Sequence, residues 1–123
     1  MEKIVINNVE IWEEGDILIM KTEGEIKAQD MEEAVKTGSA LIRKHKIKHI
    51  LSICDITKMP LDARKAAAKI YDSFSTVKKA AVVCTNPVTR AVIMFLMGVY
   101  KLPVPVKVFS NAEDAKKWFR EKE

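Results

Sequence analysis

Two short polar stretches, each containing a cysteine, are the places where this sequence most readily offers chemistry. Cys54-Asp55 and Cys84-Thr85-Asn86 each follow a short apolar run typical of a buried strand. If these strands are neighbours in a parallel sheet, the sulfurs approach each other at the carboxyl ends, where ligands collect in open α/β sheets. The predicted ligand- or partner-binding residues are Cys54, Asp55, Thr57, Cys84, Thr85, Asn86, Met94 and Met97.

The same residues also have a simpler interpretation. A cysteine at a strand end is commonly a small buried hydrophobe, because a thiol becomes nucleophilic only when a neighbour lowers its pKa. Asp55 and Asn86 have ordinary explanations as a turn acceptor and a helix cap. A thiol enzyme would need a nearby histidine, and His45 and His49 are both predicted at the opposite end of the sheet. We therefore predict no catalytic residue and no enzymatic activity, with a thiol-dependent enzyme as the remaining alternative.

Metal and cofactor sites are not predicted. His45 and His49 have the spacing of ligands on one helix face, but His49 belongs to the strand that follows the helix. No set of Cys, His, Asp and Glu has the spacing of a metal site, and the four glycines form no phosphate-binding loop. The basic stretch from Arg43 to His49 is expected to be a solvated helix end, with a binding patch as the alternative.

Length and composition limit the class of protein. The chain has 123 residues, 48% of them hydrophobic, so we expect a single domain over residues 1–123. Two cysteines are too few for a disulfide framework, and the sequence begins without the pattern of an export signal, which favours a cytoplasmic protein. The formal charge of +4 is modest and is interleaved with 17 acidic residues, so nucleic acid is not expected as the partner.

The positions of apolar residues predict an alternation of strands and helices. Residues 4–22 are predicted to form a hairpin around Glu14-Gly15-Asp16, in which Asn7 and Asn8 mark a bulge or a late strand start. Residues 30–46 have helical periodicity, with Asp30 as the cap. Residues 49–54 and 79–84 are predicted as buried parallel strands, joined by a helix that Asp62 caps. Residues 106–109 are predicted as the last strand, and a helix capped by Asn111 follows.

The predicted helix from Pro87 to about Tyr100 is apolar around most of its circumference. A helix that covers a sheet needs only one apolar stripe, so the surplus is expected to contact something else. The segment is too short to span a bilayer, which leaves deeper burial in the monomer, a protein partner or second copy, or an apolar ligand. Met94 and Met97 suit the last two, because thioethers adapt to irregular surfaces.

The order of these elements, together with three short sequence motifs, resembles the STAS family, the anti-sigma-factor antagonist-like or SpoIIAA-like proteins. Gly24-Glu25-Ile26 is similar to the family's Gly-Glu-Leu-Asp motif, although Lys27 stands in place of the aspartate. Residues 53–57 resemble its Asp-Leu-Ser segment, and residues 108–118 resemble the end of the SpoIIAA-like branch. The resemblance implies an α/β fold with a mixed sheet of about five strands, opened by a β-hairpin, and four helices.

The resemblance also directs attention to Thr57. STAS anti-anti-sigma proteins present a phosphorylatable serine at the start of the second helix, whereas this sequence has Thr57-Lys58-Met59-Pro60-Leu61-Asp62 in that region. Thr57 is the candidate substitute, because phosphate is favoured near a helix N-terminus, although Asp62 would repel it.

Fold resemblance and the missing catalytic set lead to two functional hypotheses. The first is a non-enzymatic regulatory or protein-binding STAS-like module, expected as a homodimer, that acts through the third helix and the loop after Asp55. The alternative is a carrier or sensor of a small apolar or anionic ligand, bound between the strand ends and the third helix.

Overall fold

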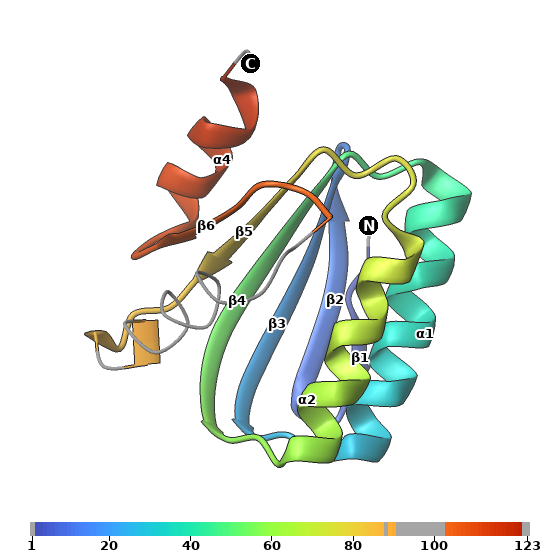
Figure 1. Cartoon of the computed structure of the whole chain (residues 1–123), viewed down its shortest axis with the longest axis vertical. Helices are drawn as coiled ribbons and strands as arrows, with labels where there is room; N and C mark the ends of the chain where they lie inside the picture. The colour runs from blue at the N-terminus through green and yellow to red at the C-terminus, as the bar shows by residue number, and fades with distance from the viewer. Residues whose placement is uncertain (1, 88, 91–102, 122–123) are drawn as a thin grey trace.

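The parallel and antiparallel strands of the chain form one mixed sheet (Figure 1). The computed structural model describes residues 2–87, 89–90 and 103–121. Within these residues the sheet has six strands in chain order, the first three antiparallel and β3 to β6 parallel. The strands are β1 (Ile4–Ile6), β2 (Val9–Glu14), β3 (Ile17–Glu25), β4 (His49–Lys58), β5 (Lys79–Val83) and β6 (Val106–Phe109). This arrangement confirms the predicted α/β class.

The sheet has one strand more than predicted, because Asn7 and Asn8 form a tight turn between β1 and β2. Asn7 has φ 48, a left-handed conformation that asparagine tolerates better than most residues. The two side chains then fasten the turn to its surroundings: Asn7 Nδ2 donates to Asp30 Oδ1 at 2.9 Å, and Asn8 Nδ2 donates to the Glu25 carbonyl at 2.8 Å. The predicted bulge at this point is therefore wrong, and β2 pairs with two strands.

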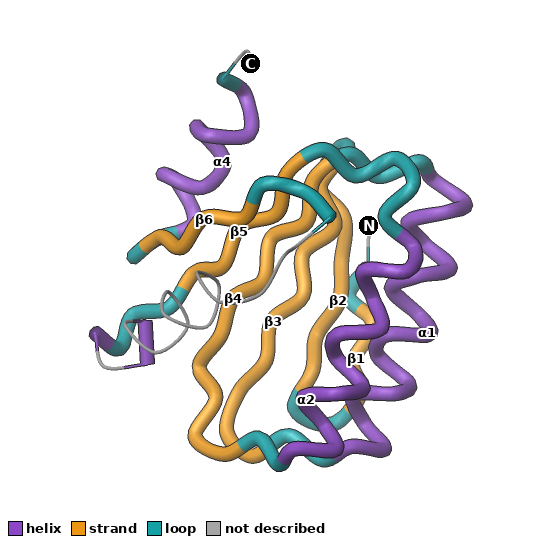
Figure 2. Tube along the Cα trace, viewed as in Figure 1, coloured by secondary structure: helices purple, strands orange, loops and turns teal. Residues whose placement is uncertain are grey.

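Helices cover both faces of the sheet. The described helices are α1 (Ala28–His45), α2 (Leu61–Ala68), the 3-10 helix η1 (Lys69–Ser73) and α4 (Ala112–Arg120). Figure 2 shows α1 and α2 side by side on one face and α4 on the opposite face. Of the third predicted helix, the structure describes Pro87 and residues 89–90 as helical, and residues 91–100 lie outside the described residues.

The starts of α1 and α2 differ from the prediction. The cap positions are held by Lys27 and Pro60, and neither makes a side-chain capping bond. Asp30 and Asp62, which we predicted as caps, lie within the first turns instead, where Asp62 Oδ1 accepts the N–H of Ala63 at 2.8 Å. Both carboxylates still lie near the positive end of a helix dipole, so the sequence signal was displaced by a few residues rather than absent.

The core consists of two layers that the alternation of β-strand side chains separates. Leu18 and Ile50 point toward α1 and α2 and are buried among aliphatic residues. Ile19 and Leu51, one residue further along, point to the opposite face and pack under α4. The central strands are therefore covered on both faces, as their continuous apolar runs predicted.

Strand β4 is longer than predicted and continues past the end of β5 (Figure 1). The pairing of β4 with β5 ends at Ile53 and Val83, whereas β4 itself runs on to Lys58 alongside β3. The carboxyl edge of the sheet is therefore stepped. We call the residues around this point the step: Cys54, Asp55, Cys84, Thr85 and Asn86.

Candidate functional site

The step brings the two predicted cysteine stretches together. Ile53 pairs with Val83 in the parallel register of β4 and β5, so the following residues, Cys54 and Cys84, are neighbours across the two strands. The expectation that these strands are adjacent is confirmed. Asp55, however, lies inside β4 rather than at its end, so the predicted loop after Asp55 is wrong and residues 55–58 are strand.

The alternation of side chains divides the step between the two faces of the sheet. Cys54 and Cys84 lie on the α1/α2 face, in one register row with Thr22 of β3. Asp55 and Thr85 lie on the α4 face, where Thr85 Oγ1 donates to Asp55 Oδ1 at 3.4 Å. The sequence placed these groups around one site, and the structure separates the thiols from the polar pair.

The thiols lack the features of a catalytic nucleophile. Burial raises the pKa of Cys54, and the neighbouring Cys84 and Asp55 raise it further, against an opposing hydrogen bond with Thr22. Cys84 is buried, and its Sγ donates to the Asn86 carbonyl at 3.7 Å. His49 stands five residues earlier on β4, roughly 16 Å from Cys54 at the usual rise of a strand. A thiolate is therefore disfavoured, and no imidazole is placed to activate it.

Asn86 starts a helical segment, as the sequence predicted. The N–H of Thr89 donates to Asn86 Oδ1 at 3.3 Å, and the N–H of Arg90 donates to the Asn86 carbonyl at 2.9 Å. Arg90 also donates from Nη1 to the Cys84 carbonyl at 3.5 Å, which ties this segment back to the step. Met94 and Met97, the remaining predicted residues of this segment, lie outside the described residues.

Thr57 occupies a bulge near the end of β4 instead of the start of a helix. The pairing with β3 passes from Gly24 opposite Ile56 to Glu25 opposite Lys58, so Thr57 is the extra residue and is exposed. Helix α2 begins four residues later, at Leu61. The helix dipole that made Thr57 an attractive phosphoacceptor is therefore further away than predicted, and its modification stays a prediction.

A polar surface on the α4 face extends from the step to the edge strand β1, and sequence reasoning missed it. Helix α4 lies over β4, β5 and β6, and the apolar cluster beneath it extends as far as Ile53, Val83 and Phe109. Beyond it, side chains of the same alternation phase are exposed or half-buried, and Val5 is 63% exposed. We call this surface the open face: Val5, Glu10, Lys21, Glu23, Asp55 and Thr85.

The open face contains a shallow depression of ≈ 280 Å³ around Glu10, bounded by Val5, Lys21 and Glu23. Lys21 Nζ lies 3.9 Å from Glu23 Oε1, so cation and anion alternate across the surface. The available sequence signal was on one side of β3, where Lys21 and Glu23 follow the partly buried Ile17 and the buried Ile19. Polar residues in a phase that is otherwise apolar indicate where the covering helix ends.

The opposite edge of the sheet, where the parallel strands begin, holds both histidines, as predicted. The ring of His49 stacks on Phe119 with centroids 4.6 Å apart. His49 Nδ1 is buried without a hydrogen bond and lies 3.7 Å from Asp16 Oδ1. Burial lowers the pKa of His49, and the Asp16 carboxylate opposes this effect. His45 instead lies on α1 and contacts Glu13 at 2.7 Å.

Lys79 is the most buried cation of this edge, with 6% of its surface exposed. Its ammonium donates to the carbonyls of Trp118 and Glu121, at 2.9 and 3.0 Å, and lies 5.1 Å from the centre of the Trp118 ring. The Trp118 carbonyl lies in the last turn of α4 and also accepts the N–H of Glu121, and the Glu121 carbonyl belongs to the C-cap residue just past the helix. Lys79 thus closes the C-terminal end of α4 from the neighbouring strand.

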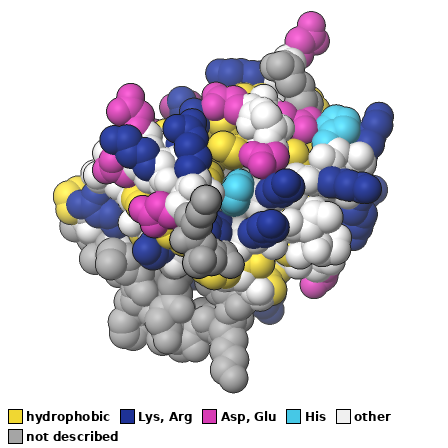
Figure 3. Space-filling model, turned by 90° about the horizontal axis from the view of Figure 1, so that it is seen from above, with side chains coloured by type: hydrophobic (Ala, Val, Ile, Leu, Met, Phe, Trp, Pro, Cys, Tyr) yellow, Lys and Arg dark blue, Asp and Glu magenta, His cyan; other side chains and the backbone are white. Residues whose placement is uncertain are grey.

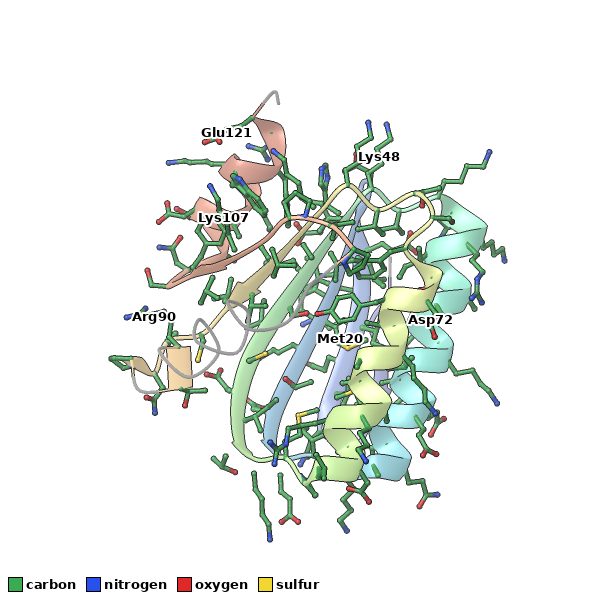
Figure 4. The ribbon with its side chains drawn as sticks, viewed as in Figure 1. Met20, Lys48, Asp72, Arg90, Lys107 and Glu121 are labelled. Carbon is green, nitrogen blue, oxygen red and sulfur yellow. The ribbon has the colours of Figure 1, made fainter. Side chains whose placement is uncertain are left out.

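We call this region the amino edge. A depression of ≈ 430 Å³ lies there, and its lining consists of Asp16, Lys48, His49, Lys78, Lys79, Phe119 and Glu121. Figure 4 shows Lys48 and Glu121 at this end of the molecule, away from Arg90, and Figure 3 views it from above, with basic and acidic side chains around a histidine. Arg43, Lys44 and Lys46 are exposed, as expected for a solvated helix end.

In residues 2–87, 89–90 and 103–121, no three His, Cys, Asp or Glu side chains are grouped so that they could hold a metal ion. Over the same ranges, no helix has the length and apolar character needed to cross a bilayer.

The stepped mixed sheet with α1 and α2 on one face and α4 on the other is a SpoIIAA-like, STAS-type fold. An uncharacterized protein of the DUF3478 family from Shewanella loihica PV-4, described as having a SpoIIAA-like fold, superposes with a TM-score of 0.68 at 18% identity, over 89% of this chain and 90% of that one. The anti-sigma factor antagonist SpoIIAA in its unphosphorylated form gives 0.65 at 13% identity, over 93% and 99%.

By its sequence, the chain belongs to the family described as a domain of unknown function, DUF7793, whose model matches residues 11–123. No curated protein matches it. The matched range omits β1 and the turn that follows, and it includes the step and the amino edge. The fold that the resemblance implied is confirmed, and the number of strands is corrected from five to six.

Proposed function

We propose that this chain is a non-enzymatic regulatory module that binds another protein through the open face. The observation that carries the proposal is that α4 covers only part of its side of the sheet and leaves Val5 63% exposed beside charged residues. Protein surfaces that bind partners combine apolar contact area with polar groups that fix orientation. The step adjoins this face through Asp55 and Thr85, so it supplies hydrogen-bonding groups at its border.

The chemistry of the step supports a binding role over a catalytic one. Burial raises the pKa of Cys54, Cys84 is itself buried, and the described residues offer no metal-binding group. Asp55 and Thr85 keep exposed side chains whose mutual hydrogen bond, at 3.4 Å, is long enough to be exchanged for a partner's groups. Binding can use these groups without any change in the fold.

The likeness to the anti-sigma factor antagonist SpoIIAA points in the same direction. By its name, that protein acts against another protein, and its fold matches this chain over 93% of the length. At 13% identity this likeness gives a reason to look for a protein partner and says nothing about which one. The expected homodimer, the contribution of Met94 and Met97, and the ligand-carrier alternative stay predictions.

Site-directed photo-crosslinking in cells of the source organism tests the binding surface. A photoreactive amino acid replaces Glu23 or Asp55 on the open face in the full-length chain, and Lys36 on the outer side of α1 serves as the control position, because all three are exposed. We expect a discrete protein adduct from the two open-face positions and none from Lys36. Equal adducts from all three positions, or an adduct from Lys36 alone, would contradict the proposal.

A charge placed on the open face sharpens the test. Val5→Glu puts a carboxylate in the exposed apolar position, where the effect on folding stability is expected to stay within about 0.5 kcal/mol. Partner binding is expected to weaken by about tenfold or more, because the apolar contact is replaced by a buried charge in the complex. Unchanged crosslinking from Asp55 in this variant would show that Val5 does not contribute to partner binding.

A further inference from the structure

The two cysteines of the step lie one residue beyond the last paired positions of two neighbouring strands. Their residues follow the last paired positions of β4 and β5, Ile53 and Val83. The backbone N–H of Cys84 donates to the Phe109 carbonyl at 3.1 Å, so Cys84 continues the ladder toward β6 and keeps a strand-like position. Neighbouring strands are about 4.8 Å apart. Disulfides span Cα separations of about 4.4–6.8 Å, so this pair meets the distance requirement without movement of the backbone.

Both side chains lie on the same face of the sheet. Ile50 and Ala80 form an earlier pair in the same register, and both are buried against the α1/α2 layer. Cys54 and Cys84 each follow four residues later, which is two full periods of the strand, so their thiols point to that same side. An interaction between the thiols also contributes to the raised pKa of Cys54, as expected for neighbouring groups.

We propose that Cys54 and Cys84 form an intramolecular disulfide when the protein is oxidised. The inference rests on strand register alone and is independent of the proposed function. With hydrogen peroxide as the oxidant, the thiolate of one cysteine attacks a peroxide oxygen and the O–O bond breaks. The cysteine becomes a sulfenic acid, and the departing hydroxide takes up the proton that the thiol released and becomes water. The second thiol then attacks the sulfenic sulfur, and the S–S bond forms as a second water leaves. Two thiols lose two electrons and two protons, and one peroxide is reduced to two waters.

The first attack is assigned to Cys54. Cys84 is only 1% exposed, whereas Cys54 is half-buried and therefore the more exposed of the two. Because burial raises the pKa of Cys54, little thiolate is present at neutral pH, and oxidation is expected to be slow there and faster as the pH rises. The disulfide is therefore expected to form during prolonged exposure to peroxide and not during brief exposure.

Mass spectrometry of the full-length protein tests the bridge. The protein is reduced, freed of reductant and treated with hydrogen peroxide, and the remaining thiols are blocked with iodoacetamide under denaturing conditions. We expect a species that has lost two hydrogen atoms and takes up no alkyl group, with a proteolytic fragment joining the two cysteines. Reduction before blocking is expected to restore two alkylation sites. Cys54→Ser and Cys84→Ser are expected to form no internal bridge.

A shifted pair provides the matched control. Ser52→Cys combined with Cys54→Ser keeps two thiols on the same face but moves one of them two residues back along β4. The Cα separation then rises to about 8 Å, beyond the reach of a disulfide in an intact sheet. We expect the native pair to close at least tenfold faster than the shifted pair.

Three outcomes would overturn the proposal. The first is quantitative alkylation of both native cysteines after prolonged oxidation, which would show that the sulfurs do not meet. The second is oxidation that yields only disulfides between chains or stops at a sulfinic acid. The third is closure of the shifted pair at the same rate as the native pair, which would show that strand opening, and not the register, brings the sulfurs together.

Discussion

The two ends of the parallel strands use their polar residues in different ways. At the amino edge, Lys79 is buried and donates to two carbonyls of α4, and His49 stacks on Phe119. At the step, Asp55 and Thr85 are exposed and share one long hydrogen bond. At the amino edge the polar groups hold a helix to the sheet, whereas at the step they remain at the surface. Residue type alone therefore does not separate a structural polar group from one available to a partner.

The largest expected effect belongs to Trp118→Ala at the amino edge. Trp118 is 7% exposed, packs on Phe109 and lies under the ammonium of Lys79. Removing the indole leaves a cavity between α4 and the sheet, so the free energy of unfolding should fall by about 3–5 kcal/mol. Urea denaturation measures it, with exposed Lys117→Ala as the control. A loss below about 1 kcal/mol would show that α4 contributes little and would break the comparison.

Lys79→Met should have the next largest effect. The substitution keeps the apolar stem but removes the ammonium that donates to the Trp118 and Glu121 carbonyls, so among the described residues Trp118 retains only the N–H of Glu121 as a partner. The free energy of unfolding is expected to fall by about 1–3 kcal/mol, and amide exchange in the last turn of α4 should accelerate. Lys78→Met, one residue away and exposed, is the matched control. Equal effects of the two substitutions would assign the loss to overall charge instead of the capping contacts.

A smaller effect is expected from His49 as the pH changes. Its pKa in the folded protein is lowered, chiefly by burial, so the unfolded chain binds the proton more readily. Its stabilising contribution is therefore fully present above about pH 6.5 and is lost as the pH falls through the lowered pKa. Unfolding curves between about pH 5 and 7.5 should show this slope, and His49→Gln should flatten it. His45→Gln should leave the contribution of His49 in place, and a steeper slope in His49→Gln would reverse the assignment.

The smallest effect on stability is expected at the step. Asp55→Asn and Thr85→Val each change an exposed side chain and one long hydrogen bond, so each should alter the free energy of unfolding by less than about 0.5 kcal/mol. Partner crosslinking should nevertheless weaken, because these groups border the open face. Differential scanning calorimetry and crosslinking from Glu23 measure the two effects separately. A loss of stability comparable to that of Lys79→Met would show that Asp55 and Thr85 also stabilise the fold.

The sequence predicted most of the described elements, although not β1, because hydrophobic periodicity is a local property. It located the strands that contain His49 and Lys79, the helix capped by Asn111 and the hairpin at Gly15. Asn111 Oδ1 indeed accepts the N–H of Asp114 at 2.9 Å. The helices after residues 27 and 60 began earlier than their acidic residues suggested, because a carboxylate in the first turn gains from the dipole without capping.

The candidate site could be predicted only in part, because its geometry depends on pairing. The sequence predicted that Cys54 and Cys84 approach each other if their strands are neighbours, which β4 and β5 are. Their separation from Asp55 and Thr85 follows from the alternation of a strand that was expected to end sooner. The continuation of β4 to Lys58 depends on pairing with β3, which is a long-range contact. The open face arises because α4 covers part of the sheet, and no window of sequence reports where a helix will lie.

The strict sequential order of the six described strands has a consequence for synthesis on the ribosome. Every strand after the first pairs with the strand made just before it, so no segment must wait for a partner that has yet to be translated. Each new strand can add to an edge that is already in place, and the loop to be closed is only as long as one connection. The sheet can therefore grow in the direction of translation, from β1 toward β6.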